Sequence, residues 1–99
     1  MRNCYDSAMI VTNQHHETAV VVRRDGQTVS FVRLRAGKLG CERLDEAAFR
    51  EAWRESPYPL PETIERFLEH GRIHGATQEA IKGLTRLQER DRAVIASLF

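Results

Sequence analysis

His70 and His74 have a spacing at which two side chains can share a metal ion. Residues four apart lie on the same side of a helix, so two imidazoles at this spacing can ligate one Zn²⁺. Gly71 lies between them, however, and a glycine there predicts the end of a helix. The stretch reads H-G-R-I-H and lacks the glutamate of the zinc-protease pattern. We therefore expect no shared metal site, and we assign His70 to the negative end of its own helix.

Cys41 is the other residue whose side chain could take part in a reaction. A thiol nucleophile needs a neighbouring base, and no local signature around Cys4 or Cys41 supplies a histidine. Cys41 fits a small apolar position on a strand instead. A small metal- or thiol-dependent enzyme using His70, His74 and Cys41 is thus our third hypothesis. We expect a protein that is not an enzyme and carries no cofactor.

Basic and amide side chains in two segments could contact nucleic acid. A hairpin near residues 18–35 is locally basic, and a helix beginning at Thr77 offers groups that can read bases or grip phosphates. Against this, the net charge is only +1, and the connection from Gly71 to Ala76 exceeds the three or four residues of a helix-turn-helix. A nucleic-acid-binding regulator is therefore our second hypothesis. Its contact residues would be Arg23, Arg33, Arg35, Lys38, Gln78, Lys82 and Arg86.

The composition predicts one domain in which such groups must be positioned. The chain has 99 residues, of which 41% are hydrophobic and 29% charged, as is usual for a soluble globular domain. The apolar run from Ala8 to Val11 is too short for a signal peptide or a membrane span. We expect one α+β domain over residues 1–99, located in the cytoplasm, with no membrane contact.

The first half of the chain predicts an antiparallel meander of three or four strands within residues 8–43. Asp25-Gly26 lies between two β-branched runs, which is a strong hairpin signal. A two-residue loop there would place Val22 opposite Val29 and Val20 opposite Phe31. A turn at Ala36-Gly37 would then pair Leu39 with Leu34 and Cys41 with Val32, although a one-residue change would flip this strand. Residues 8–12 could add an edge strand.

The second half, residues 45–98, predicts three helices that pack mainly on one face of the sheet. Asp45 is a suitable N-cap for the first, with Leu44 packing on Phe49. The second begins near Pro61 and ends at Gly71, and the third follows the cap Thr77 and continues to about Leu98.

In this arrangement the other face of the sheet lacks a cover. We expect Val20, Val22, Val29 and Phe31 to form an apolar patch rimmed by Arg24, Arg33 and Arg35. The C-terminal AVIASLF would need a partner as well, inside the monomer or outside it. Our first hypothesis is therefore a non-enzymatic interaction or regulatory protein that binds a protein partner or a second copy of itself, most simply as a homodimer.

Overall fold

A computed structural model describes the backbone of residues 9–97 and the side chains of residues 9–90. Cys4 and the side chains of the AVIASLF segment therefore lie outside the described residues. The chain forms an α+β fold, as the sequence predicts. Its elements are, in order, β1 (Met9–Thr12), β2 (Thr18–Asp25), β3 (Thr28–Arg35), β4 (Lys38–Asp45), α1 (Glu46–Ala52), β5 (Arg54–Glu55), α2 (Leu60–His74) and α3 (Gln78–Ser97).

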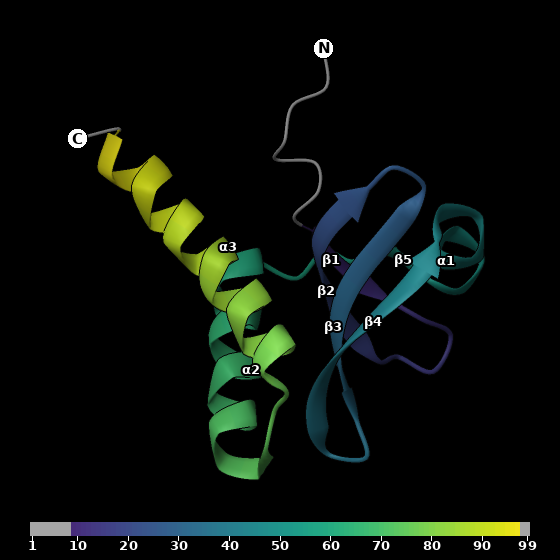
Figure 1. Ribbon diagram of the computed structural model, residues 1–99, viewed down its shortest axis with the longest axis horizontal. Coiled ribbons are helices and arrows are strands. Elements are labelled where there is room, and N and C mark those ends of the chain that lie inside the picture. Colours follow the sequence, from purple (N-terminus) through teal and green to yellow (C-terminus); the bar gives the residue numbers. More distant parts are fainter. Residues whose placement is uncertain (1–8, 98–99) are drawn as a thin grey trace.

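The strands form an antiparallel sheet that is covered on both faces. Their order is β4-β3-β2-β1-β5, so the meander of β1 to β4 is extended by the two-residue strand β5 beside β1. Figure 1 shows the long helices α2 and α3 on one side of the sheet and the short helix α1 on the other. Most of the helical residues thus lie on one face, and α1 covers much of the face that was expected to be open.

The β2–β3 hairpin departs from the predicted register, by two residues next to the turn and by one residue over Ala19–Val21. Asp25 pairs with Thr28, so the loop residues are Gly26 and Gln27, and Phe31 pairs with Val21 instead of Val20. Only Gly26 of the two has a positive φ, 64°, whereas the predicted turn required positive φ at both central residues. Because side chains alternate between faces, the one-residue shift moves Val20 to the face opposite Phe31.

A β-bulge at Val22 adjusts β2 to this register. The pairing passes from Val21 opposite Phe31 directly to Arg23 opposite Ser30, which leaves Val22 as the extra residue. Beyond the bulge, Arg24 pairs with Val29 and lies on the α1 side of the sheet. On the α1 side of the sheet, β2 therefore presents the apolar side chain of Val21 before the bulge and the charged side chain of Arg24 after it.

The β3–β4 hairpin has the predicted register. Leu34 pairs with Leu39 and Val32 with Cys41. Both loop residues have positive φ, 53° at Ala36 and 79° at Gly37, as a two-residue turn of this type requires. The edge strand predicted at residues 8–12 is also present as β1, with Ile10 opposite Val20.

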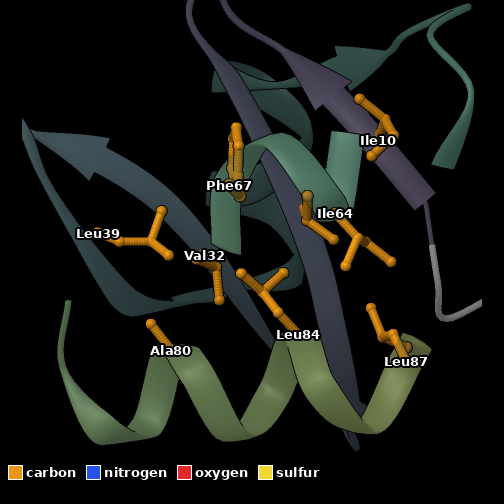
Figure 2. Close-up of a cluster of buried hydrophobic side chains, with 9 residues drawn as sticks. Ile10, Val32, Leu39, Ile64, Phe67, Ala80, Leu84 and Leu87 are labelled. Atoms are coloured by element: carbon orange, nitrogen blue, oxygen red, sulfur yellow. The ribbon is translucent and has the colours of Figure 1, made fainter. Parts of the chain in front are cut away.

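The larger core lies between the sheet and the helices α2 and α3. Figure 2 shows side chains from β1, β3 and β4 meeting those of both helices, with Leu84 at the centre of the view. The cluster of buried residues consists of Ile10, Val20, Val32, Leu39, Ile64, Phe67, Ala80, Leu84 and Leu87. Fully burying a side chain such as Leu84 stabilises the fold by about 1.5–3 kcal/mol.

A second, aromatic core lies under α1. The ring of Phe31 has its centroid 5.4 Å from those of both Phe49 and Trp53. Leu44 packs against the same cluster, as predicted for the start of this helix. Val11, Ala19, Val21 and Val29 complete its buried floor.

Helix α2 continues through Gly71, contrary to the prediction that it ends there. Gly71 does not have a positive φ and is buried. A Cβ atom placed on it would lie 2.9 Å from Cβ of Ala76 and 3.2 Å from Cδ2 of Leu39. Glycine is therefore needed at this position for close packing, and Gly75, with a φ of 113°, ends the helix one turn later. Thr77 caps α3 as predicted, since its Oγ1 accepts a hydrogen bond from the Ala80 N–H at 3.2 Å.

Candidate functional site

The predicted apolar patch on the sheet is not a surface of the protein. Val20, Val29 and Phe31 are completely buried, and Val22 is half-buried against Gly83 of α3. Val20 and Val22 face α2 and α3, whereas Val29 and Phe31 face α1. The prediction of a shared exposed face is therefore wrong, because the change of register separates these residues and α1 covers the second pair.

The arginines predicted to rim this patch are paired with carboxylates. Arg24 Nη1 donates to Oε1 of Glu46 at 2.8 Å, and Arg33 Nη2 donates to Oε1 of Glu17 at 2.8 Å. The remaining arginines of the hairpin region pair likewise: Arg23 with Asp25, Arg35 with Glu42 and Arg43 with Glu79. The locally basic sequence is thus neutralised in the fold, which weakens its case as a phosphate-binding surface.

Two of these arginines also stack on the aromatic core. The guanidinium carbon of Arg33 lies 5.3 Å from the ring centroid of Trp53, and that of Arg24 lies 5.9 Å from that of Phe49. Only 17% of the Arg33 side chain is exposed, and its Nε has no hydrogen-bond partner. These are cation–π contacts that hold α1 and Trp53 on the sheet. Sequence reasoning missed them because it could not place Trp53 beside β3.

The β1–β2 turn organises the carboxylate that Arg33 uses. Asn13 Oδ1 accepts hydrogen bonds from the backbone N–H groups of His15 and Glu17, and Asn13 Nδ2 donates to Oε1 of Glu17 at 2.8 Å. This hydrogen bond from Asn13, followed by the charge of Arg33, holds the pKa of Glu17 below its usual value. In the same way, Arg50 and then Arg24 lower the pKa of Glu46.

This turn and α1 enclose an open, largely polar hollow of about 730 Å³. His15 and His16 line it together with Glu51 and Arg54, and all four side chains are exposed. His16 has a φ of 63°, so the pair lies in a tight turn, as its sequence suggests. None of the residues that line the hollow is buried, so we assign no ligand to it.

Cys41 lies on β4 and packs partly against the larger core. Burial, followed by the charge of Glu79, raises the pKa of its thiol. A raised pKa disfavours the thiolate, which is the nucleophilic form. The thiol-dependent hypothesis therefore finds no activated nucleophile in Cys41.

His70 and His74 are brought together, because α2 does not end at Gly71. Their ring centroids are 4.5 Å apart, and Nε2 of His70 lies 3.0 Å from the carbonyl oxygen of Gly37 in the β3–β4 turn. The prediction that a helix end at Gly71 separates these two histidines is thus wrong. In the described part of the chain, though, no cluster of three or more histidine, cysteine or acidic residues is arranged to hold a metal.

The residues of α3 that were predicted to contact nucleic acid are exposed. Gln78, Lys82 and Arg86 lie four residues apart along the helix, and all three side chains face solvent. The connection from α2 to α3 is Gly75–Thr77, three residues instead of six. Lys38, at the start of β4, is also exposed but lies in the β3–β4 hairpin.

A mainly apolar groove of about 550 Å³ lies between α2 and α3. Leu68, Ala76 and Ile81 form its half-buried apolar part, and Glu65 and Glu69 of α2 border it. Figure 1 shows α3 crossing α2 and then continuing past it. We use the name outer helical face for the groove together with the exposed side chains of Glu62, Glu65, Lys82 and Arg86.

Both helices expose charged side chains beside the groove or on their solvent-facing sides. Glu62 and Glu65 of α2 are exposed, as are Lys82 and Arg86 of α3. Among the described residues no ion pair engages these four side chains, whereas Glu69 is paired with Arg72. The three-residue turn that joins the two helices was not foreseen from the sequence.

Comparison of the chain with protein-family models, with curated proteins and with solved structures gives no match. Within residues 9–97, none of the helices has the length and apolar character needed to cross a membrane.

Proposed function

We propose that this protein is a protein–protein interaction module that binds a second copy of itself through the outer helical face. The observation that carries the proposal is the apolar groove between the two helices, which Glu65 of α2 borders, together with the exposed Lys82 and Arg86 on α3. Burial of both sheet faces in the monomer supports it indirectly, since the apolar residues of the sheet are then not available as an interface. The role is non-enzymatic and regulatory, with a cytoplasmic location as part of the same proposal.

A twofold axis makes the outer helical face complementary to itself. In a twofold interface the same patch is used by both copies, so α2 of one copy can lie across α3 of the other. Glu62 and Glu65 then approach Lys82 and Arg86 of the second copy, and the reverse pairs form at the other end. The half-buried Leu68 and Ile81 would meet near the axis and lose their remaining contact with water.

Charge reversal tests this arrangement without disturbing either core. We expect the wild-type chain to dimerise in light scattering after size exclusion over a hundredfold dilution, and to dissociate more readily at high salt. Glu65→Lys and Lys82→Glu should each weaken the dimer roughly tenfold or more, because juxtaposed like charges cost several kcal/mol and 1.4 kcal/mol is a factor of ten.

The double variant Glu65→Lys with Lys82→Glu should regain most of the affinity, since the charges again oppose each other. Glu51→Lys, an exposed change on α1, is the matched control and should leave the dimer intact. A wild-type chain that stays monomeric at all concentrations contradicts the proposal. So does a dimer that both single variants leave unchanged.

A second candidate function is nucleic-acid binding through α3. It is favoured by the exposed row Gln78, Lys82 and Arg86 after a three-residue turn, which matches the length preferred in helix-turn-helix proteins. It predicts binding of duplex DNA that falls steeply with salt and is lost in Arg86→Ala. Absence of any mobility shift at low salt would exclude it.

A further inference from the structure

We propose that His70 and His74 form a two-imidazole binding site for a divalent transition metal ion. Both residues lie in the last turns of α2, four apart on one side of the helix, with ring centroids separated by 4.5 Å. Their side chains border a hollow of about 450 Å³, and His74 is exposed, so an ion can reach the pair. The hollow shares Glu65 and Glu69 with the groove between α2 and α3, but His70 and His74 line only the hollow, so the metal site does not require the proposed dimer.

The contact of His70 with the β3–β4 turn fixes one ring nitrogen. A carbonyl oxygen only accepts hydrogen bonds, so Nε2 of His70 must donate to Gly37 across the 3.0 Å separation. The lone pair of the neutral ring then lies on Nδ1, which becomes the atom able to bind a metal. A metal-ligating histidine commonly donates its other N–H to a backbone carbonyl in this way, which orients the ring and raises its basicity.

The surrounding charges permit a cation at this position. The C-terminal end of a helix carries partial negative charge, and both histidines lie in the last five residues of α2. Glu65 and Glu69 line the same hollow and oppose the charge of Arg66. Arg72, also in the last turn, is paired with Glu69.

The two imidazoles decide which metal ion binds. Imidazole suits Ni²⁺, Cu²⁺ and Zn²⁺, whereas Mg²⁺ and Ca²⁺ prefer oxygen ligands. With no third histidine, cysteine or acidic ligand arranged around the pair in the described residues, water or another added ligand fills the remaining positions. We therefore expect reversible binding of one ion for each chain, in the order Cu²⁺ above Ni²⁺.

Titration of the full-length, untagged chain with NiCl₂ in a calorimeter tests the site. The expected result is one ion bound for each chain, together with a rise in the melting temperature that grows with Ni²⁺ concentration. His74→Asn should lower the affinity at least tenfold and abolish the rise. His16→Asn is the matched control, since it removes an exposed histidine from the other pair, and it should change neither quantity.

A parallel titration with MgCl₂ should show no binding, because the site offers nitrogen ligands. His70→Asn provides a second check, with metal affinity measured after circular dichroism has shown that the fold is retained. The proposal is overturned if Ni²⁺ binding is undetectable at millimolar concentration. It is equally overturned if His74→Asn binds as tightly as the wild type while His16→Asn does not.

Discussion

Glu17 is the residue through which the β1–β2 turn contributes to the aromatic core. It accepts from Asn13 on its own turn and from Arg33, whose guanidinium stacks on Trp53. Removing either the carboxylate or its charge leaves Arg33, which is mostly buried, with fewer partners. The exposed acidic side chain of Glu17 is thus part of the packing of α1 on the sheet.

This role makes stability depend on pH in a defined direction. The pKa of Glu17 in the folded chain is below its ordinary value of 4.5, so the carboxylate contributes stability above about pH 4.5 and loses it as the pH falls through the folded value. Glu17→Gln should therefore be less stable than the wild type at pH 7, and the difference should shrink at pH 3.5. Urea unfolding at both pH values measures it.

Glu51→Gln, which removes an exposed carboxylate on α1, serves as the control and should behave like the wild type at both pH values. A constant difference between the wild type and Glu17→Gln from pH 7 to pH 3.5 would contradict this account of Glu17.

At the scale of elements, Gly71 lets α2 approach β4 and the 75–77 connection. The backbone of this connection pairs with β4, since Leu39 N–H donates to Gly75 O and Thr77 N–H donates to Leu39 O, each at 3.0 Å. A side chain on Gly71 would push α2 away from these contacts. The position of α3, and with it the outer helical face, therefore depends on this glycine.

Gly71→Ala should destabilise the protein, although alanine is the better helix former. Helix propensity favours alanine by about 1 kcal/mol, but overpacking costs about 1–3 kcal/mol, and here the added Cβ would lie 2.9 Å from Cβ of Ala76. Thermal unfolding followed by circular dichroism should show a lower melting temperature. Gly40→Ala, where the added Cβ meets nothing within 4 Å, is the control for a clash and should change stability less. A more stable Gly71→Ala protein would show that the gap closes without strain.

The same glycine illustrates which elements sequence reasoning can predict. The Ala36-Gly37 turn, the pairing of Leu34 with Leu39 and the cap at Thr77 follow from local chemistry, and all are present. The prediction for Gly71 was wrong because the sequence does not distinguish a glycine required for close packing from a glycine that ends a helix.

The β2–β3 register failed for a related reason. Asp25-Gly26 is compatible with two turn types. The less expected turn, with Gly26 and Gln27 as its loop residues, forms here, and the bulge at Val22 lets apolar side chains of β2 still face both cores. The prediction of an exposed apolar patch was wrong for the same reason, because it depended on that register. The ion pairs of Arg24 and Arg33 could not be foreseen either, since their carboxylates Glu46 and Glu17 lie 22 and 16 residues away in the sequence.

At the scale of the whole molecule, one sheet separates two cores that share β1, β2 and β3. The core under α1 contains Trp53, which is the only tryptophan of the chain, whereas most helical residues lie on the opposite face. Tryptophan fluorescence therefore reports on one side of the sheet and far-ultraviolet circular dichroism mainly on the other. Because Val20 and Val21 are neighbours that face opposite cores, we expect neither core to persist without the other.

Leu84→Ala tests this coupling from the side away from Trp53. Leu84 is completely buried, so its truncation should cost about 2–5 kcal/mol. If the sheet couples the two cores, the fluorescence and circular dichroism transitions should stay coincident in urea and move together to a lower midpoint. If the core under α1 folds independently, the fluorescence midpoint should remain where it is in the wild type while the dichroism midpoint falls. Lys82→Glu, an exposed change two residues away on α3, is the control and should leave the two signals of the monomer unchanged when both are measured below the dimer dissociation constant.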